Sequence, residues 1–256
     1  MRRQLTAAVP AADTHRRLLL RRRLDGVLDW ARFRLDTFPR APLLVGLSQR
    51  TEYQPLPWAG VAGRKRGAAT WSRWRAIDRR LASEGDLRTA IDLGAAGGFF
   101  TVKLAERGLS VVAVEDDPSA YRTALYVLRK ARVANAGVLT VSLSPATVDL
   151  LPRVDVTLFL SLWHHLVRAE GLAEATAMLR RIWNRTGRLM FFETGESEMP
   201  PEFGLPPMEP SAREWLFALL SETCEHARIE HLGEHDAFDP AGGPVSRNLF
   251  AVCRTA

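Results

Sequence analysis

The sequence has little cysteine: Cys224 and Cys253 are the only two among 256 residues. They lie far apart and form no pattern of metal ligands, so neither a disulfide framework nor a zinc site is expected. The simplest interpretation is two reduced, partly buried thiols, because free cysteine is among the most buried residue types. The sequence therefore predicts no metal centre.

Long hydrophobic runs are absent as well. No stretch approaches the roughly 18 uninterrupted apolar residues of a membrane-spanning helix. Near the N-terminus, arginines flank the short run Leu18-Leu19-Leu20, which excludes the apolar core of a secretory signal. These absences predict a cytoplasmic protein without a transmembrane segment. The sequence also shows no internal repeat.

Charge is plentiful but unevenly distributed. Residues 1–80 hold 18 Lys or Arg and 6 Asp or Glu, whereas residues 81–256 hold 17 and 23. This asymmetry predicts a basic N-terminal extension, residues 1–84, ahead of a globular domain, residues 85–256. Within the extension, apolar spacing predicts helices over 13–38 and 70–81, and the intervening residues 39–68, rich in Pro and Gly, are interpreted as a lid or linker.

From about residue 88, short apolar runs alternate with longer segments of helical periodicity, which is typical of α/β proteins. The predicted strands are 89–93, 110–114, 138–141, 154–160, 188–192, 226–232 and 248–252. The predicted helices are 99–107, 119–132, 166–185 and 212–224, with a short one after Pro145. Together they predict a doubly wound, mostly parallel seven-stranded sheet that ends in an antiparallel hairpin, with a helical N-terminal extension.

A glycine-rich turn, Asp92-Leu93-Gly94-Ala95-Ala96-Gly97-Gly98, leads from the first predicted strand into a helix. Glycines allow a tight turn and a close approach to a ligand, and the first helical turn has free N–H groups. The spacing is not that of a dinucleotide loop, and the carboxylate of Asp92 would repel a pyrophosphate. A nicotinamide oxidoreductase is therefore disfavoured.

This run resembles motif I of the class I S-adenosylmethionine-dependent methyltransferases. The resemblance implies that the loop holds the amino-acid part of S-adenosyl-L-methionine, through Asp92, Gly94, Ala95, Ala96, Gly97 and Phe99. The next strand ends at Glu115, whose carboxylate can accept both ribose hydroxyl hydrogens. By resemblance, Glu115 is the ribose ligand and Asp116 lies beside the adenine. Ser144, where the family often has an acidic residue, and Ser161 complete the expected cofactor contacts.

The fourth predicted strand runs into Ser161-Leu162-Trp163-His164-His165, at the edge where open α/β sheets bind ligands. Methyl transfer to a hydroxyl needs alignment and removal of a proton. His164 resembles by position the base of small-molecule O-methyltransferases, and His165 is the second candidate. Glu193, at the end of the fifth strand, is a candidate for orienting the acceptor. Local roles, packing a helix start or capping a loop, remain open for all three residues.

The predicted activity is O-methylation of a small molecule or glycan, with S-adenosyl-L-homocysteine as product. RNA methylation is an alternative, because Arg64-Lys65-Arg66 precede Trp71 and Trp74 in the basic extension, and cations with aromatics can hold phosphates and stack bases. A non-catalytic module that binds S-adenosylmethionine is a second alternative. The arginine-rich helix at 13–38 also suits peripheral contact with an anionic membrane.

Overall fold

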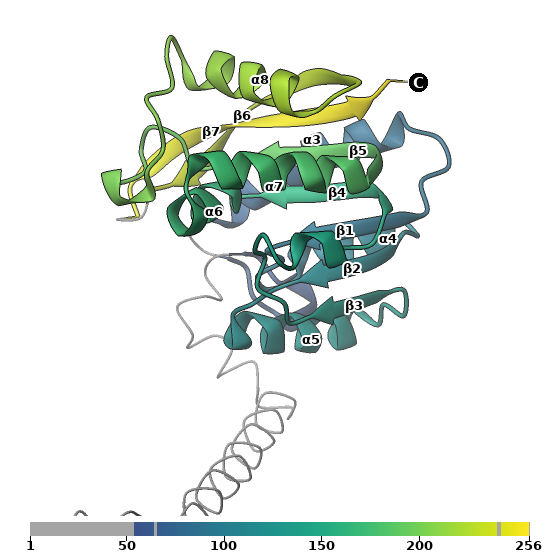
Figure 1. Cartoon of the computed structure of the whole chain (residues 1–256). Coiled ribbons are helices and arrows are strands. Elements are labelled where there is room, and N and C mark those ends of the chain that lie inside the picture. Colours follow the sequence, from purple (N-terminus) through teal and green to yellow (C-terminus); the bar gives the residue numbers. More distant parts are fainter. Residues whose placement is uncertain (1–53, 64–65, 240–241, 256) are drawn as a thin grey trace, which may run out of the picture.

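The computed structural model describes residues 54–63, 66–239 and 242–255 (Figure 1). The helix predicted at 13–38 and most of the basic extension lie outside these ranges. Within them, no helix has both the length and the apolar character needed to cross a bilayer.

Seven strands form one sheet in the order β3-β2-β1-β4-β5-β7-β6 (Figure 1). Their bounds are β1 (Thr89–Leu93), β2 (Ser110–Val114), β3 (Ala136–Leu139), β4 (Val154–Leu160), β5 (Thr186–Glu193), β6 (Ala227–Phe238) and β7 (Pro244–Arg254). Strands β1 to β5 run parallel, and β7 pairs antiparallel with both β5 and β6. The predicted fold class, a mostly parallel sheet with a terminal antiparallel hairpin, is confirmed.

Helices and short 3₁₀ helices precede and connect these strands. Their bounds are η2 (Pro57–Ala59), α3 (Gly67–Ala82), α4 (Phe99–Glu106), α5 (Pro118–Ala131), η3 (Val148–Leu150), α6 (Trp163–Glu170), α7 (Leu172–Arg185), η4 (Pro201–Phe203) and α8 (Ala212–Thr223). The single helix predicted over 166–185 is wrong: Gly171 adopts φ 83° and ψ 161°, which separates α6 from α7. The chain changes direction there because glycine has no Cβ to oppose a positive φ.

The strands buried on both faces, β1, β2 and β4, have the predicted bounds, because continuous apolar runs mark them clearly. β3 is an edge strand that begins at Ala136, which pairs with Val111, two residues before the predicted start. The predicted range 138–141 is therefore wrong by two residues. β6 and β7 are longer than predicted because their pairing continues out to Phe238 and Pro244.

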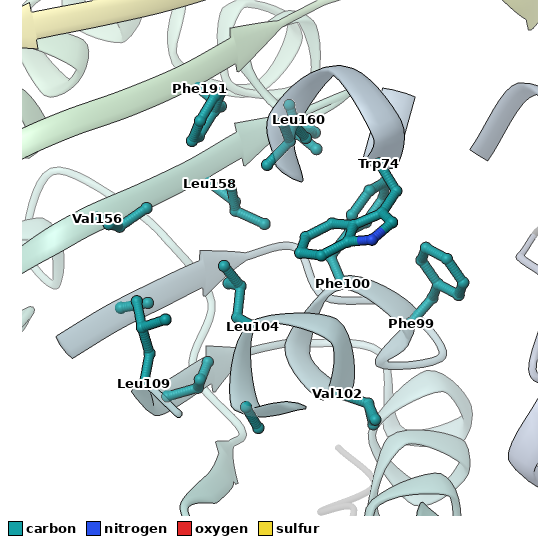
Figure 2. Packing of buried hydrophobic residues seen from close by; sticks show 14 of the residues in the cluster. Trp74, Phe99, Phe100, Val102, Leu104, Leu109, Val156, Leu158, Leu160 and Phe191 are labelled. Carbon is teal, nitrogen blue, oxygen red and sulfur yellow. The ribbon is translucent and has the colours of Figure 1, made fainter. Parts of the chain in front are cut away.

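Hydrophobic side chains cover both faces of the sheet. On one face, Trp74 of α3 and Phe100 of α4 pack over Leu158 and Phe191 (Figure 2). On the other face, helices α6, α7 and α8 bury a second cluster that includes Trp183. α3 therefore shares the core of the sheet, although the sequence assigned its residues to the extension.

Candidate active site

The glycine loop joins β1 to α4 with a left-handed backbone at three positions. Gly94 has φ 71°, Gly98 has φ 83° and Ala96 has φ 49°. A Cβ at Gly98 would lie 3.3 Å from the Cβ of Ala124 in α5. The backbone N–H of Gly94 donates to the carbonyl of Val114 at 2.9 Å, which holds the loop against the end of β2. Glycine at these turns thus serves both the backbone conformation and close packing.

Two carboxylates meet at this loop. Asp92 Oδ2 accepts a hydrogen bond from Thr101 Oγ1 at 2.6 Å. Glu115 accepts from the backbone N–H groups of Ala96 at 2.7 Å and Asp117 at 2.9 Å. Burial, reinforced by the charge of Glu115, raises the pKa of Asp92 to about 6. Burial also raises the pKa of Glu115. Because both ionised forms are disfavoured, a positively charged group bound here would stabilise them.

Three other predicted cofactor residues, Asp116, Ser144 and Phe99, lie around the glycine loop or in the loop after β3. Ser142 Oγ donates to Asp116 at 3.2 Å, which links the end of β2 to the loop after β3. In that loop Ser144 is paired with Thr147, through its backbone N–H at 2.9 Å and its hydroxyl at 3.1 Å. The ring of Phe99 is fully buried in the core. Phe99 can therefore offer a ligand only its backbone.

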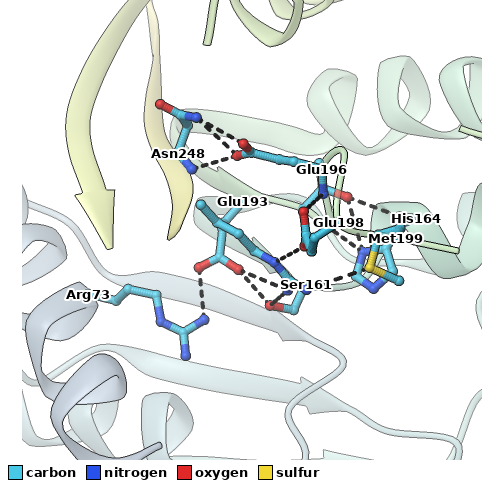
Figure 3. Close-up of polar contacts among 11 residues, drawn as sticks. Arg73, Ser161, His164, Glu193, Glu196, Glu198, Met199 and Asn248 are labelled. Carbon is cyan, nitrogen blue, oxygen red and sulfur yellow. Dashed lines mark hydrogen bonds and ion pairs between the residues drawn. The ribbon is translucent and has the colours of Figure 1, made fainter. Parts of the chain in front are cut away.

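Beyond β4 and β5, a buried ionic cluster surrounds Glu193 (Figure 3). The carboxylate has no exposed surface and accepts from Arg73 at 2.8 Å and from Ser161 Oγ at 2.6 Å. Arg247 lies 3.7 Å away and also pairs with Glu198 at 2.8 Å. Burial raises the pKa of Glu193, but the charges of Arg73 and Arg247 outweigh it and hold the pKa below its usual value. Glu193 therefore stays ionised and joins α3, β5 and β7.

The loop after β5 carries a second carboxylate, Glu196, whose pKa is raised, whereas that of Glu193 is lowered. Glu196 accepts from the backbone N–H of Asn248 at 2.6 Å and from its side-chain amide at 3.1 Å (Figure 3). Burial, together with the charges of Glu198 and Glu193, raises the pKa of Glu196 to about 7 despite those hydrogen bonds. The loop is thus fastened to β7 by Glu196 and Glu198.

His164, at the start of α6, is buried and already hydrogen-bonded. Its Nδ1 accepts from the backbone N–H of Gly195 at 2.9 Å and lies 3.1 Å from Thr194 Oγ1. Burial, followed by the charges of His165 and Arg247, lowers the pKa of His164 to about 2. The neutral ring therefore carries its proton on Nε2, and the lone pair on Nδ1 already accepts the hydrogen bond from Gly195. These contacts disfavour His164 as a proton acceptor.

His165 is exposed one residue further on, with its ring centre 4.3 Å from that of His164. Partial desolvation and the charges of Arg168 and Arg247 lower its pKa, while Asp116 opposes them. No hydrogen bond to the His165 ring is found in the part of the chain that the structure describes. His165 is thus neutral at pH 7 and accessible.

The expected site residues did not include the two arginines of the ionic cluster, Arg73 and Arg247, or Gln54, whose Oε1 accepts from the backbone N–H of Phe99 at 3.3 Å. Arg73 stood out only as one of several cations near Trp71 and Trp74, and its partner Glu193 lies 120 residues away. Both cysteines are buried free thiols, as expected. Within the described ranges, no group of three or more His, Cys, Asp or Glu side chains is arranged to hold a metal ion.

No protein-family model matches the chain. Over 107 residues the chain is 34% identical to uncharacterized methyltransferases of Mycobacterium bovis and Mycobacterium tuberculosis. The match covers 38% of this chain and 40% of each relative. The chain therefore spans about 40% of the length of the curated relatives it matches.

Solved structures extend the likeness over most of the chain. WbdD, a bifunctional kinase-methyltransferase, superimposes with a TM-score of 0.64 at 24% identity over 82% of this chain and 46% of that chain. Magnesium protoporphyrin IX methyltransferase from Synechocystis, solved with bound S-adenosylmethionine, gives a TM-score of 0.56 at 12% identity over 77% and 85%. The chain has the class I methyltransferase fold, and the expected resemblance to methyltransferases is confirmed by this fold and by the names of its relatives.

Proposed function

We propose that this chain is a methyltransferase that uses S-adenosyl-L-methionine. The main support is the pair of carboxylates, Asp92 and Glu115, on adjacent strand ends around the glycine loop, both with a raised pKa. The sulfonium and ammonium groups of S-adenosylmethionine supply the positive charge that this pair lacks. A pyrophosphate would add negative charge instead, so the same observation argues against NAD.

Replacing Glu115 with Gln should weaken binding of S-adenosylhomocysteine about 10- to 100-fold, because a charged acceptor for the ribose hydroxyls is lost. Isothermal calorimetry measures this directly, with NAD as the competing ligand and Glu222→Gln on the exposed side of α8 as the matched control. Absence of binding by the wild-type chain, or equal affinity in Glu115→Gln, contradicts the cofactor assignment.

The acceptor reaction we propose is O-methylation of a small molecule or glycan, with His165 as the base. His165 has an exposed, neutral ring near Asp116, whereas the lone pair of His164 is engaged by Gly195. In this arrangement His164 holds the start of α6 and offers only the Nε2 proton. Glu193 acts indirectly, by fixing Ser161 and Arg247 beside the acceptor.

His165→Ala should lower kcat about 100-fold or more with a hydroxyl acceptor, the usual effect of removing a general base. Because the pKa of His165 is lowered, the wild-type rate should be flat above neutral pH and fall as acid protonates the ring. Release of labelled methyl groups to a panel of sugars and small alcohols measures both effects. The exposed His226→Ala is the control, and unchanged turnover by His165→Ala would rule out this base.

A further inference from the structure

A short segment before α3 packs directly on the glycine loop. Residues 54–63 fold back on themselves, with Leu56 bridged to Val61, and Trp58 donates its Nε1 to Glu106 of α4 at 2.9 Å. A Cβ at Gly97 would lie 3.1 Å from Leu56, tighter than ordinary contacts. Position 97 is therefore kept small by this segment, which forms a second wall of the cofactor loop.

Gln54 brings a polar side chain into this wall. It is only 5% exposed, and its Oε1 accepts from the backbone N–H of Phe99, the first residue of α4, at 3.3 Å. The same oxygen lies 3.4 Å from a Cβ built at Gly97. This hydrogen bond fixes the orientation of the amide. Among the described residues, nothing accepts a hydrogen bond from the Nε2 of Gln54, so two amide hydrogens are available to a ligand.

The charges around the loop orient a zwitterionic ligand. Asp92 and Glu115 form its negative side, which attracts an ammonium or sulfonium group. The N-terminus of α4 carries the positive end of the helix dipole, which attracts a carboxylate; there the N–H of Phe99 donates to Gln54, and Thr101 in the same turn bonds Asp92. Gln54 lies at that helix end and adds a neutral donor to it.

We propose that Gln54 binds the carboxylate of the amino-acid part of S-adenosylmethionine through its Nε2. This inference rests on the proposed function. It gives the segment at 54–63 a role in distinguishing the complete cofactor from analogues without a carboxylate. Oε1 holds the start of α4 while Nε2 contacts the ligand, so one side chain joins the segment, the helix and the cofactor.

The substitution Gln54→Glu separates these two tasks. It keeps an oxygen acceptor for the Phe99 N–H but replaces the donor with a negative oxygen. Calorimetry should show binding of S-adenosylhomocysteine weakened about 10-fold or more. The decarboxylated analogue S-adenosyl-3-thiopropylamine should bind Gln54→Glu as well as it binds the wild-type chain, or better. Trp58→Phe, which removes the hydrogen bond to Glu106 and part of the ring contact with Phe99, should leave the ratio of the two affinities unchanged.

Three outcomes overturn the inference. Equal weakening for both ligands means that Gln54 acts only through packing of the segment. Unchanged affinity for S-adenosylhomocysteine means that Nε2 does not contact the carboxylate. If the wild-type chain binds neither ligand, the proposed function itself fails, a result distinct from the first two because the substitution is not involved.

Discussion

Asp92→Asn should make the ligand-free chain more stable and its cofactor binding weaker. Asp92 is 3% exposed and its pKa is raised from 3.8 to about 6, so the fold disfavours its charge. Asparagine removes that charge and still accepts the hydrogen bond from Thr101. At pH 8 the gain in the free energy of unfolding should reach about 3 kcal/mol, the value of a shift of this size. Urea denaturation measures it.

The stability gained by Asp92→Asn should depend on pH. Because the folded pKa of Asp92 is raised, the stability contributed by its protonated form is complete below about pH 4 and is lost as the pH rises through about 6. The difference between Asp92→Asn and the wild type should therefore be small at pH 4 and largest above pH 7. A variant less stable than the wild type at pH 8 would mean that the charge of Asp92 supports the fold.

Asp155 supplies a control of opposite sign. Burial raises its pKa, but hydrogen bonds from the backbone of Arg88 and Thr89 outweigh this effect and lower it. Asp155→Asn should therefore destabilise the chain at neutral pH, and the loss should shrink as acid protonates the wild-type residue. Two aspartates of one sheet would then respond in opposite directions to the same substitution.

Asp92→Asn should stabilise the ligand-free chain but weaken its binding of S-adenosylmethionine. A bound sulfonium nucleoside brings positive charge to the carboxylate, so the affinity of Asp92→Asn for S-adenosylmethionine should fall about 10-fold or more. The wild-type chain should also release protons on binding near pH 6, because the cation lowers the pKa of Asp92. Calorimetry in buffers of different ionisation enthalpy detects that release, and it should disappear in Asp92→Asn.

The parts of the fold that the sequence predicted best are those that local pattern determines. β1, β2 and β4 are buried on both faces, so uninterrupted apolar runs define their ends. β3, at the sheet edge, alternates half-buried and exposed residues, and its register depends on pairing with β2, which the sequence alone does not display. The break at Gly171 was missed because the apolar periodicity of α6 continues into α7.

Some residues of the candidate site could likewise be recognised from local sequence, and others could not. Asp92 and Glu115 could be recognised because Asp92 opens the glycine-rich run that resembles motif I and Glu115 directly follows β2. Arg247 could not, because it reaches Glu193 only when β7 inserts between β5 and β6. Glu193 was predicted as a residue that orients the acceptor, and its fully buried ion pairs add a structural role that no local pattern reveals.

Glu193→Ala should be the most destabilising of the substitutions considered at this site. Removing the carboxylate takes from Arg73, which is 9% exposed, its contact at 2.8 Å and from Ser161 its acceptor, whereas Arg247 keeps its ion pair with Glu198. Breaking a buried ion pair from one side typically costs about 3–5 kcal/mol, because the remaining charge has lost both water and its partner. The free energy of unfolding from urea denaturation should fall by about this amount.

Two further variants separate charge from packing. Glu193→Gln keeps the shape and an acceptor for Ser161 but removes the negative charge, so it should lose a substantial part of the same stability. Asp86→Asn removes the charge that pairs with Arg88, in a pair where both side chains are largely exposed, and keeps a residue type that tolerates the left-handed backbone (φ 49°) there; it should change stability by less than about 1 kcal/mol. If Glu193→Ala falls within that range too, other partners or water must compensate Arg73 and Arg247 once the carboxylate is gone. In that case Glu193 does not hold α3 against β5 and β7.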